Sequence, residues 1–148
     1  MENLTVQEAK ELAIKEEMQN GFYIHNLVSD EGQFINCHTR GLLRNFGFIE
    51  LEVRNPKLSI EINRNILEST VSDIKYQSIP IPKNNSFIRI NKKLCMFKLL
   101  KDDFEMLIYR IIFPDDNGLY PWEDGCDPIY KTQFTESDME INRQLLNY

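Results

Sequence analysis

The segment from Phe104 to Phe113 is almost wholly apolar around Arg110. It is too short to cross a membrane, which takes about 20 apolar residues. No stretch of about 18 apolar residues occurs anywhere in the chain. An apolar run of this length is typical of a strand that is buried in the middle of a sheet. We therefore predict a sheet with Phe104–Phe113 as its central and most buried strand.

Other segments rich in β-forming residues supply the neighbours of this strand. The polar reversal Ser29–Gly32 separates Phe22–Val28 from Gln33–Arg40, and this pattern predicts a β-hairpin. In Phe48–Val53, apolar residues alternate with glutamates, which predicts a strand with one solvent-exposed face. Gly41 to Gly47 is expected to be irregular. Two further strands are expected at Phe87–Asn91 and Leu94–Leu100, joined by a turn near Asn91-Lys92.

Three segments show the start signals and the spacing of helices. Thr5 and Glu8 form a capping box, and the apolar pattern that follows ends at Gly21, which predicts an N-terminal helix over residues 5–20. A second helix is expected to pack across the sheet; Ser59 fits its N-cap, and its apolar positions are Ile60, Leu67, Val71 and Ile74. Thr135 opens a second capping box, which predicts a helix over 135–147 containing Met139, Leu145 and Leu146.

These elements predict one α+β domain over residues 1–148. Its sheet is antiparallel or mixed with about five or six strands, and helices pack mainly on one face. Alternate prolines in Ile79–Asn85 exclude a central strand there and predict an extended connector or an edge strand. Hydrophobic residues make up 42% of the chain and charged residues 27%, which are ordinary values for a globular domain.

The N-terminus and the cysteines favour a soluble cytoplasmic protein. The first 20 residues are charged throughout and lack the apolar stretch of a secretory signal. The three cysteines, Cys37, Cys95 and Cys126, are an odd number without a C-x-x-C pair. That pattern argues against a disulfide framework and against a zinc knuckle.

The net charge of -6 is unevenly distributed along the chain. Residues 83–101 hold six bases and no acid, whereas residues 102–148 hold eleven acids and three bases. An acidic protein is a poor ligand for phosphate backbones, so we do not expect nucleic-acid binding. A basic protein is the partner that this charge favours, and homo-oligomerisation stays open.

The loop from Pro114 to Pro128 concentrates fixed geometry and charge. It contains three of the six prolines, two of the six glycines and the only tryptophan. One interpretation is a rigid cover in which Trp122 closes the edge of the core. The other is a binding surface, for which the candidate residues are Asp115, Asp116, Tyr120, Trp122, Glu123 and Asp127. The spacing does not match a calcium-binding loop, because Leu119 and Cys126 fall where ligands are required, so we predict no metal and no cofactor.

Catalytic candidates are few. Cys37 and His38 are adjacent, so on a strand their side chains point to opposite faces and cannot serve each other as nucleophile and base. His25 stands opposite His38 if the hairpin has the obvious register. Glu50 is the remaining candidate. Two half-buried structural histidines and an acid–base pair are both open interpretations, and the absence of other motifs inclines us against an enzyme.

Three stretches resemble the DUF4262-type family of bacterial domains of unknown function. They are Gly21–Phe34, His38–Pro56 and, most closely, Ile112–Asp127, and the resemblance covers residues 21–133. The positions that match are Thr39, Gly41, Glu50, Trp122 and Glu123. His38 stands where the family has tyrosine, and Phe48-Ile49 replaces its histidine-proline.

The resemblance implies a compact bacterial cytoplasmic domain without an assigned reaction. It is compatible with an immunity or defence-accessory protein, or with an accessory binding module. Our leading hypothesis is therefore a non-enzymatic module that presents the Asp115–Asp127 loop to a basic partner protein. The alternative is a hydrolase or nucleotide-processing enzyme that uses His25, His38 and Glu50.

Overall fold

The computed structural model describes residues 5–145 and confirms the α+β fold. Five helices lie in this range: α1 (Val6–Asn20), α2 (Leu42–Phe46), α3 (Ile60–Lys75), α4 (Pro128–Lys131) and α5 (Glu136–Gln144). Six strands lie in the same range: β1 (Tyr23–Val28), β2 (Phe34–Arg40), β3 (Glu50–Val53), β4 (Phe87–Ile90), β5 (Lys93–Lys101) and β6 (Leu107–Ile112). None of the helices in residues 5–145 has the length and apolar content that crossing a membrane requires.

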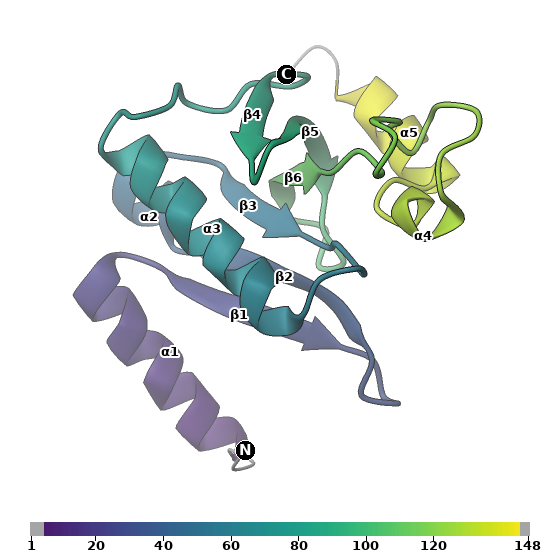
Figure 1. Cartoon of the computed structure of the whole chain (residues 1–148). Helices are drawn as coiled ribbons and strands as arrows, with labels where there is room; N and C mark the ends of the chain where they lie inside the picture. The colour runs from purple at the N-terminus through teal and green to yellow at the C-terminus, as the bar shows by residue number, and fades with distance from the viewer. Residues whose placement is uncertain (1–4, 146–148) are drawn as a thin grey trace.

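The strands form one mixed sheet in the order β1-β2-β3-β6-β5-β4 (Figure 1). Only the contact between β3 and β6 is parallel among the strand pairs of residues 5–145; the other neighbours are antiparallel. The predicted hairpin and its register are confirmed, with His25 opposite His38. β6 lies in the middle of the sheet, as predicted, and shares that place with β3.

The central strand begins later than the sequence pattern suggests. β6 starts at Leu107 rather than at Phe104. The carboxylate of Asp102 accepts hydrogen bonds from the backbone N–H groups of Phe104 (2.8 Å) and Met106 (3.0 Å). A carboxylate that satisfies these groups stabilises a turn, so residues 102–106 connect β5 to β6 instead of extending the strand.

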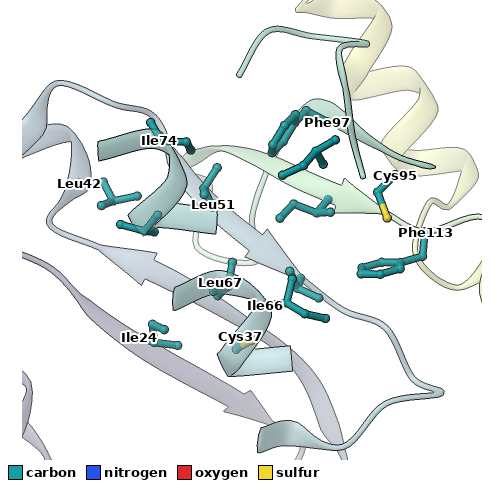
Figure 2. Close-up of a cluster of buried hydrophobic side chains, with 14 of the residues drawn as sticks. Ile24, Cys37, Leu42, Leu51, Ile66, Leu67, Ile74, Cys95, Phe97 and Phe113 are labelled. Atoms are coloured by element: carbon teal, nitrogen blue, oxygen red, sulfur yellow. The ribbon is translucent and has the colours of Figure 1, made fainter. Parts of the chain in front are cut away.

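The main core lies between α3 and one face of the sheet (Figure 2). α3 contacts β1, β2 and β3, and it buries Ile66, Leu67 and Ile74 against residues such as Cys37 and Leu51. The prediction of a second helix packed across the sheet is therefore confirmed. A side chain such as Leu67, fully buried here, contributes about 1.5–3 kcal/mol to folding.

A smaller core covers part of the opposite face. Leu100, Ile108 and Ile112 project there from β5 and β6, and Phe134 packs on them together with Met139 and Ile141 from α5. The long helices α1 and α3 therefore lie apart from α5, which contacts β5. The capping box of Thr135 with Asp138 starts α5 as predicted; Leu146 and residue 147 of the predicted helix lie outside the described residues.

The segment between Gly41 and Gly47, expected to be irregular, contains the short helix α2. Gly41 begins this helix with a φ of +104°, a region that side chains rarely adopt. A Cβ on Gly41 would also lie 2.9 Å from the carbonyl oxygen of Gly21. The link between β2 and α2 therefore passes directly against the link between α1 and β1, which requires glycine at this position.

The prediction of a solvent-exposed face on β3 is wrong. All four residues of β3 are buried, including Glu50 (7% exposed) and Glu52 (0% exposed). Buried carboxylates are stable in a protein only when hydrogen bonds or opposite charges compensate the loss of water. Both glutamates have such partners, which the period-two pattern of the sequence does not reveal.

Candidate functional site

The loop between β6 and α4 is held in shape by the buried carboxylate of Asp115. One oxygen, Oδ1, accepts the backbone N–H groups of Asn117 and Leu119, both at 2.9 Å. The other, Oδ2, accepts the N–H of Asp127 at 2.9 Å and so closes the loop on itself. These backbone hydrogen bonds lower the pKa of Asp115, so the carboxylate stays ionised at neutral pH.

Two more acidic residues of the loop also bond to its backbone. Oε1 of Glu123 accepts the N–H of Tyr120 at 2.9 Å. The carboxylate of Asp127 caps α4 by accepting the N–H of Ile129 at 3.1 Å. Hydrogen bonds from the backbone to these individual carboxylates therefore make the loop rigid.

Trp122 is enclosed by its neighbours. Its ring stacks on Tyr120 with centroids 5.1 Å apart and meets Phe134 edge-on at 5.3 Å. The ammonium of Lys98 lies 4.6 Å from the tryptophan ring centroid. Stacking and cation–π contacts of this kind fix an aromatic ring. The geometry thus supports the interpretation that Trp122 covers the smaller core formed by Leu100, Ile108, Ile112 and Phe134.

Three acidic side chains of the loop are exposed: Asp116, Asp124 and Asp127. Asp116 is 82% exposed and forms an ion pair with Lys93 at 3.0 Å. In α5, Glu136 and Glu140 are exposed as well. We call Asp116, Asp124 and Asp127 the acidic rim. These three carboxylates are the part of the loop's negative charge that a partner can reach.

The structure brings the two histidines together on the sheet face opposite α3. Nδ1 of His25 lies 3.1 Å from Nε2 of His38, and Nδ1 of His38 lies 2.8 Å from Oδ1 of Asn36. An amide oxygen only accepts, so His38 donates from Nδ1 and accepts at Nε2. His25 then donates from Nδ1, and its Nε2 keeps a lone pair on an exposed side chain.

Burial determines the protonation of this pair. It lowers the pKa of His38 to about 3, with smaller contributions from the cation of Arg40 and from His25. His25 keeps part of its surface in water, and its pKa is also lowered, first by partial burial and then by the cation of Arg40. Both imidazoles are therefore neutral at pH 7, and His25 is able to accept a proton at Nε2.

The turn between β5 and β6 lies beside the histidines. Arg40 binds the carboxylate of Asp102 at 2.7 Å, and the ring of Phe104 is 5.9 Å from that of His38 and 6.2 Å from that of His25. The hydrogen bond from Arg40 helps to lower the pKa of Asp102. The two histidines, Arg40 and Asp102 thus form a polar cluster on this face of the sheet, and the ring of Phe104 covers it.

Glu50 does not join the histidines. Its carboxylate accepts hydrogen bonds from the hydroxyl of Thr39 (2.9 Å) and from the N–H groups of Leu42 and Leu43 (both 3.2 Å). Those two N–H groups belong to the first turn of α2, where a carboxylate is stabilising. Among the described residues, neither histidine bonds to Glu50. Its role here is to cap α2, and the interpretation of Glu50 as a catalytic partner loses its geometric basis.

A buried charge network joins the sheet to α5. Nε of Arg110 donates to Glu52 at 2.7 Å, and its Nη1 donates to Asp138 at 2.8 Å and to the carbonyl of Gln133 at 2.9 Å. Arg54 donates to the same oxygen of Glu52 at 2.6 Å. Arg110 therefore connects the central strand to the segment that follows the loop.

The cysteines and the acidic residues offer no metal centre in the described part of the chain. Within residues 5–145, no group of three or more histidine, cysteine, aspartate or glutamate side chains is placed to hold a metal ion. Cys37, Cys95 and Cys126 are free and buried. Burial raises the pKa of Cys37 and of Cys95 to about 12, so both are neutral thiols at physiological pH.

Sequence reasoning reaches only those partners of His38 that lie on its own strand. Asn36 and Arg40 share the sheet face of His38 because they are two positions away on β2, a relation that the strand period already implies. Asp102 and Phe104 come from the turn between β5 and β6, and the sequence pattern places Phe104 in the following strand. Only the tertiary fold brings that turn to the histidines.

Comparison of the chain with family models, with curated proteins and with solved structures gives no match in any of the three.

Proposed function

We propose that this chain is a non-enzymatic protein-binding module that presents its acidic rim to a basic partner protein. Its resemblance to the DUF4262-type domains is part of the proposal and favours an immunity or defence-accessory role in a bacterial cytoplasm. Of the binding residues expected from the sequence, the proposal keeps Asp116 and Asp127 and adds Asp124, whereas Asp115, Tyr120, Trp122 and Glu123 are assigned to the structure of the loop. The accessible charge of the loop, rather than Trp122, is the part that contacts the partner.

One observation carries the proposal: the acidic residues of the loop divide into two groups. Asp115 and Glu123 bond to the backbone and fix the loop. Asp116 and Asp124 are exposed, and Asp116 forms a surface ion pair with Lys93. A surface that is already rigid loses little entropy on binding. Exposed charge on such a surface speeds association with an oppositely charged partner.

The division of roles determines which substitutions test the surface. Changing Trp122 or Glu123 would remove internal contacts of the loop, so a loss of binding would not distinguish surface from fold. Asp127 caps α4. Asp116 and Asp124 remain, because Asp124 is exposed and the ion pair of Asp116 with Lys93 is a surface pair worth about 0–1 kcal/mol.

We expect the double variant Asp116→Lys, Asp124→Lys to lose its partner while it stays folded. Two charge reversals replace attraction to a basic surface by repulsion. The measurement is affinity capture of the tagged protein from lysate of its own host, read by mass spectrometry. One protein should be retained by the wild type in near-equal amount and be absent from the variant eluate.

The matched control reverses two exposed acids elsewhere. Asp30→Lys, Glu31→Lys changes the net charge by the same amount in the turn between β1 and β2. This variant should retain the partner. Equal capture by all three proteins would show that the acidic rim is not the binding surface, and capture by none would leave no support for a binding module.

A second candidate function is an acid–base enzyme, favoured by the chain from Asn36 through His38 to His25. That chain fixes the tautomer of His25 and leaves its Nε2 as a base. If the candidate is correct, a screen of nucleotides and activated esters finds hydrolysis that His25→Gln abolishes and Asp116→Lys, Asp124→Lys leaves unchanged. Hydrolysis that survives His25→Gln, or none at all, would remove this candidate.

A further inference from the structure

The two edges of the sheet are built differently. At one end, α1 packs against β1 (Figure 1). At the other end, β4 pairs with β5 on one side and has no strand on its other side within residues 5–145. An uncovered edge strand is a template on which another strand can add. Within residues 5–145, β4 is thus the edge strand whose outward-facing backbone N–H and C=O groups are free to pair with another strand.

The available groups can be assigned from the pairing of β4 with β5. The carbonyl of Ser86 accepts a backbone N–H of β5 at 2.9 Å. Hydrogen-bonded positions alternate along an antiparallel strand, so Ile88 and Ile90 also bond to β5. The N–H and C=O groups of Phe87 and Arg89 consequently face the open edge. Their spacing of about 6.8 Å is that of alternate residues in a strand.

A groove runs beside this edge, between β4 and α3. Its volume is about 500 Å³. Ile66 and Ile88 line it as buried side chains, and Ile62, on α3, is 43% exposed there. Ser69 and Asp73 supply polar groups from the same helix. A groove with both apolar and polar lining next to free strand donors and acceptors is an arrangement that can bind an extended peptide by adding it to the sheet.

We propose that the groove between α3 and β4 binds an extended peptide segment of a partner protein as a seventh strand. Backbone pairing with Phe87 and Arg89 requires the extended conformation. Every second side chain of the peptide points toward α3, where Ile62 and Ile66 favour small β-branched apolar residues. Asp73 favours a basic residue at one end. The site uses no residue of the acidic rim, so it stands or fails independently of the proposed function.

The test follows backbone amide shifts of the 15N-labelled full chain by NMR. The probe is a capped peptide of alternating valine and threonine with one lysine at each end. A second peptide carries N-methyl groups at the amides that pair with β4. We expect saturable shifts at Phe87 and Arg89 and along the Ile62 and Ser69 side of α3, and none with the N-methylated peptide.

Three variants separate binding from folding. Arg89→Pro removes an edge N–H that β5 does not use, and Ser69→Trp fills the groove from an exposed position of α3. Each should weaken peptide binding at least tenfold. Ser72→Trp, on the side of α3 that faces α1, should bind like the wild type. Shifts at β1 instead, no saturable shifts up to millimolar peptide, or self-association through β4 without peptide would each overturn the proposal.

Discussion

Replacing Arg110 by methionine is expected to lower the free energy of unfolding by about 3–5 kcal/mol. Arg110 is 1% exposed and donates to the carboxylates of Glu52 and Asp138. Methionine has a similar volume and fills the space, but it leaves both carboxylates buried with fewer partners. Removing one member of a buried ion-pair network costs far more than the intact network contributes. Chemical denaturation followed by circular dichroism measures the change.

The control for this prediction is an arginine whose ion pair is exposed. Arg143 pairs with Glu140 on the surface of α5 at 2.5 Å. Arg143→Met should therefore lower the free energy of unfolding by less than about 1 kcal/mol. Similar losses in the two variants would mean that the network around Arg110 does not hold α5 to the sheet.

The stability of the protein is expected to fall by about 2 kcal/mol between pH 7 and pH 5 because of His38 alone. In the folded protein, burial lowers the pKa of His38 to about 3, whereas the unfolded chain has the ordinary value of about 6.5. Above pH 6.5 both states are neutral and the stability is complete. As the pH falls from 6.5 toward 3, only the unfolded state takes up the proton, so unfolding is favoured.

The measurement compares pH profiles rather than absolute stabilities. His38→Gln removes the titrating group and retains a hydrogen-bonding side chain. Its free energy of unfolding should fall by about 2 kcal/mol less than that of the wild type between pH 7 and pH 5. The lowered pKa of His25 adds a smaller decrease of the same sign in both proteins. Parallel profiles for wild type and variant would contradict the assignment of His38 as a buried neutral imidazole.

The sequence pattern predicted the elements whose burial is regular. The capping boxes at Thr5 and Thr135 located the starts of α1 and α5, and the spacing of Leu67, Val71 and Ile74 located α3. The polar reversal at Ser29–Gly32 located the hairpin of β1 and β2. These features are local, or they repeat with the period of one element, so a single sequence contains them.

The features that failed depend on contacts between distant segments. Glu50 and Glu52 alternate with apolar residues like a solvent-exposed face, yet α2 and Arg110 bury them. Asp102 turns the chain only because its carboxylate finds N–H groups two and four residues later. For the loop, the sequence identified the acidic residues but gave no sign that Asp115 faces inward while Asp116 faces solvent.

The most direct test of the acidic rim is the affinity of the captured partner, once purified, for three forms of the protein. The Kd of the wild type and of Asp30→Lys, Glu31→Lys should agree. The Kd of Asp116→Lys, Asp124→Lys should be at least about tenfold larger, a loss of about 1.4 kcal/mol, and the difference should shrink as salt is added. An equal Kd for all three forms at low salt would contradict the claim that the rim binds the partner.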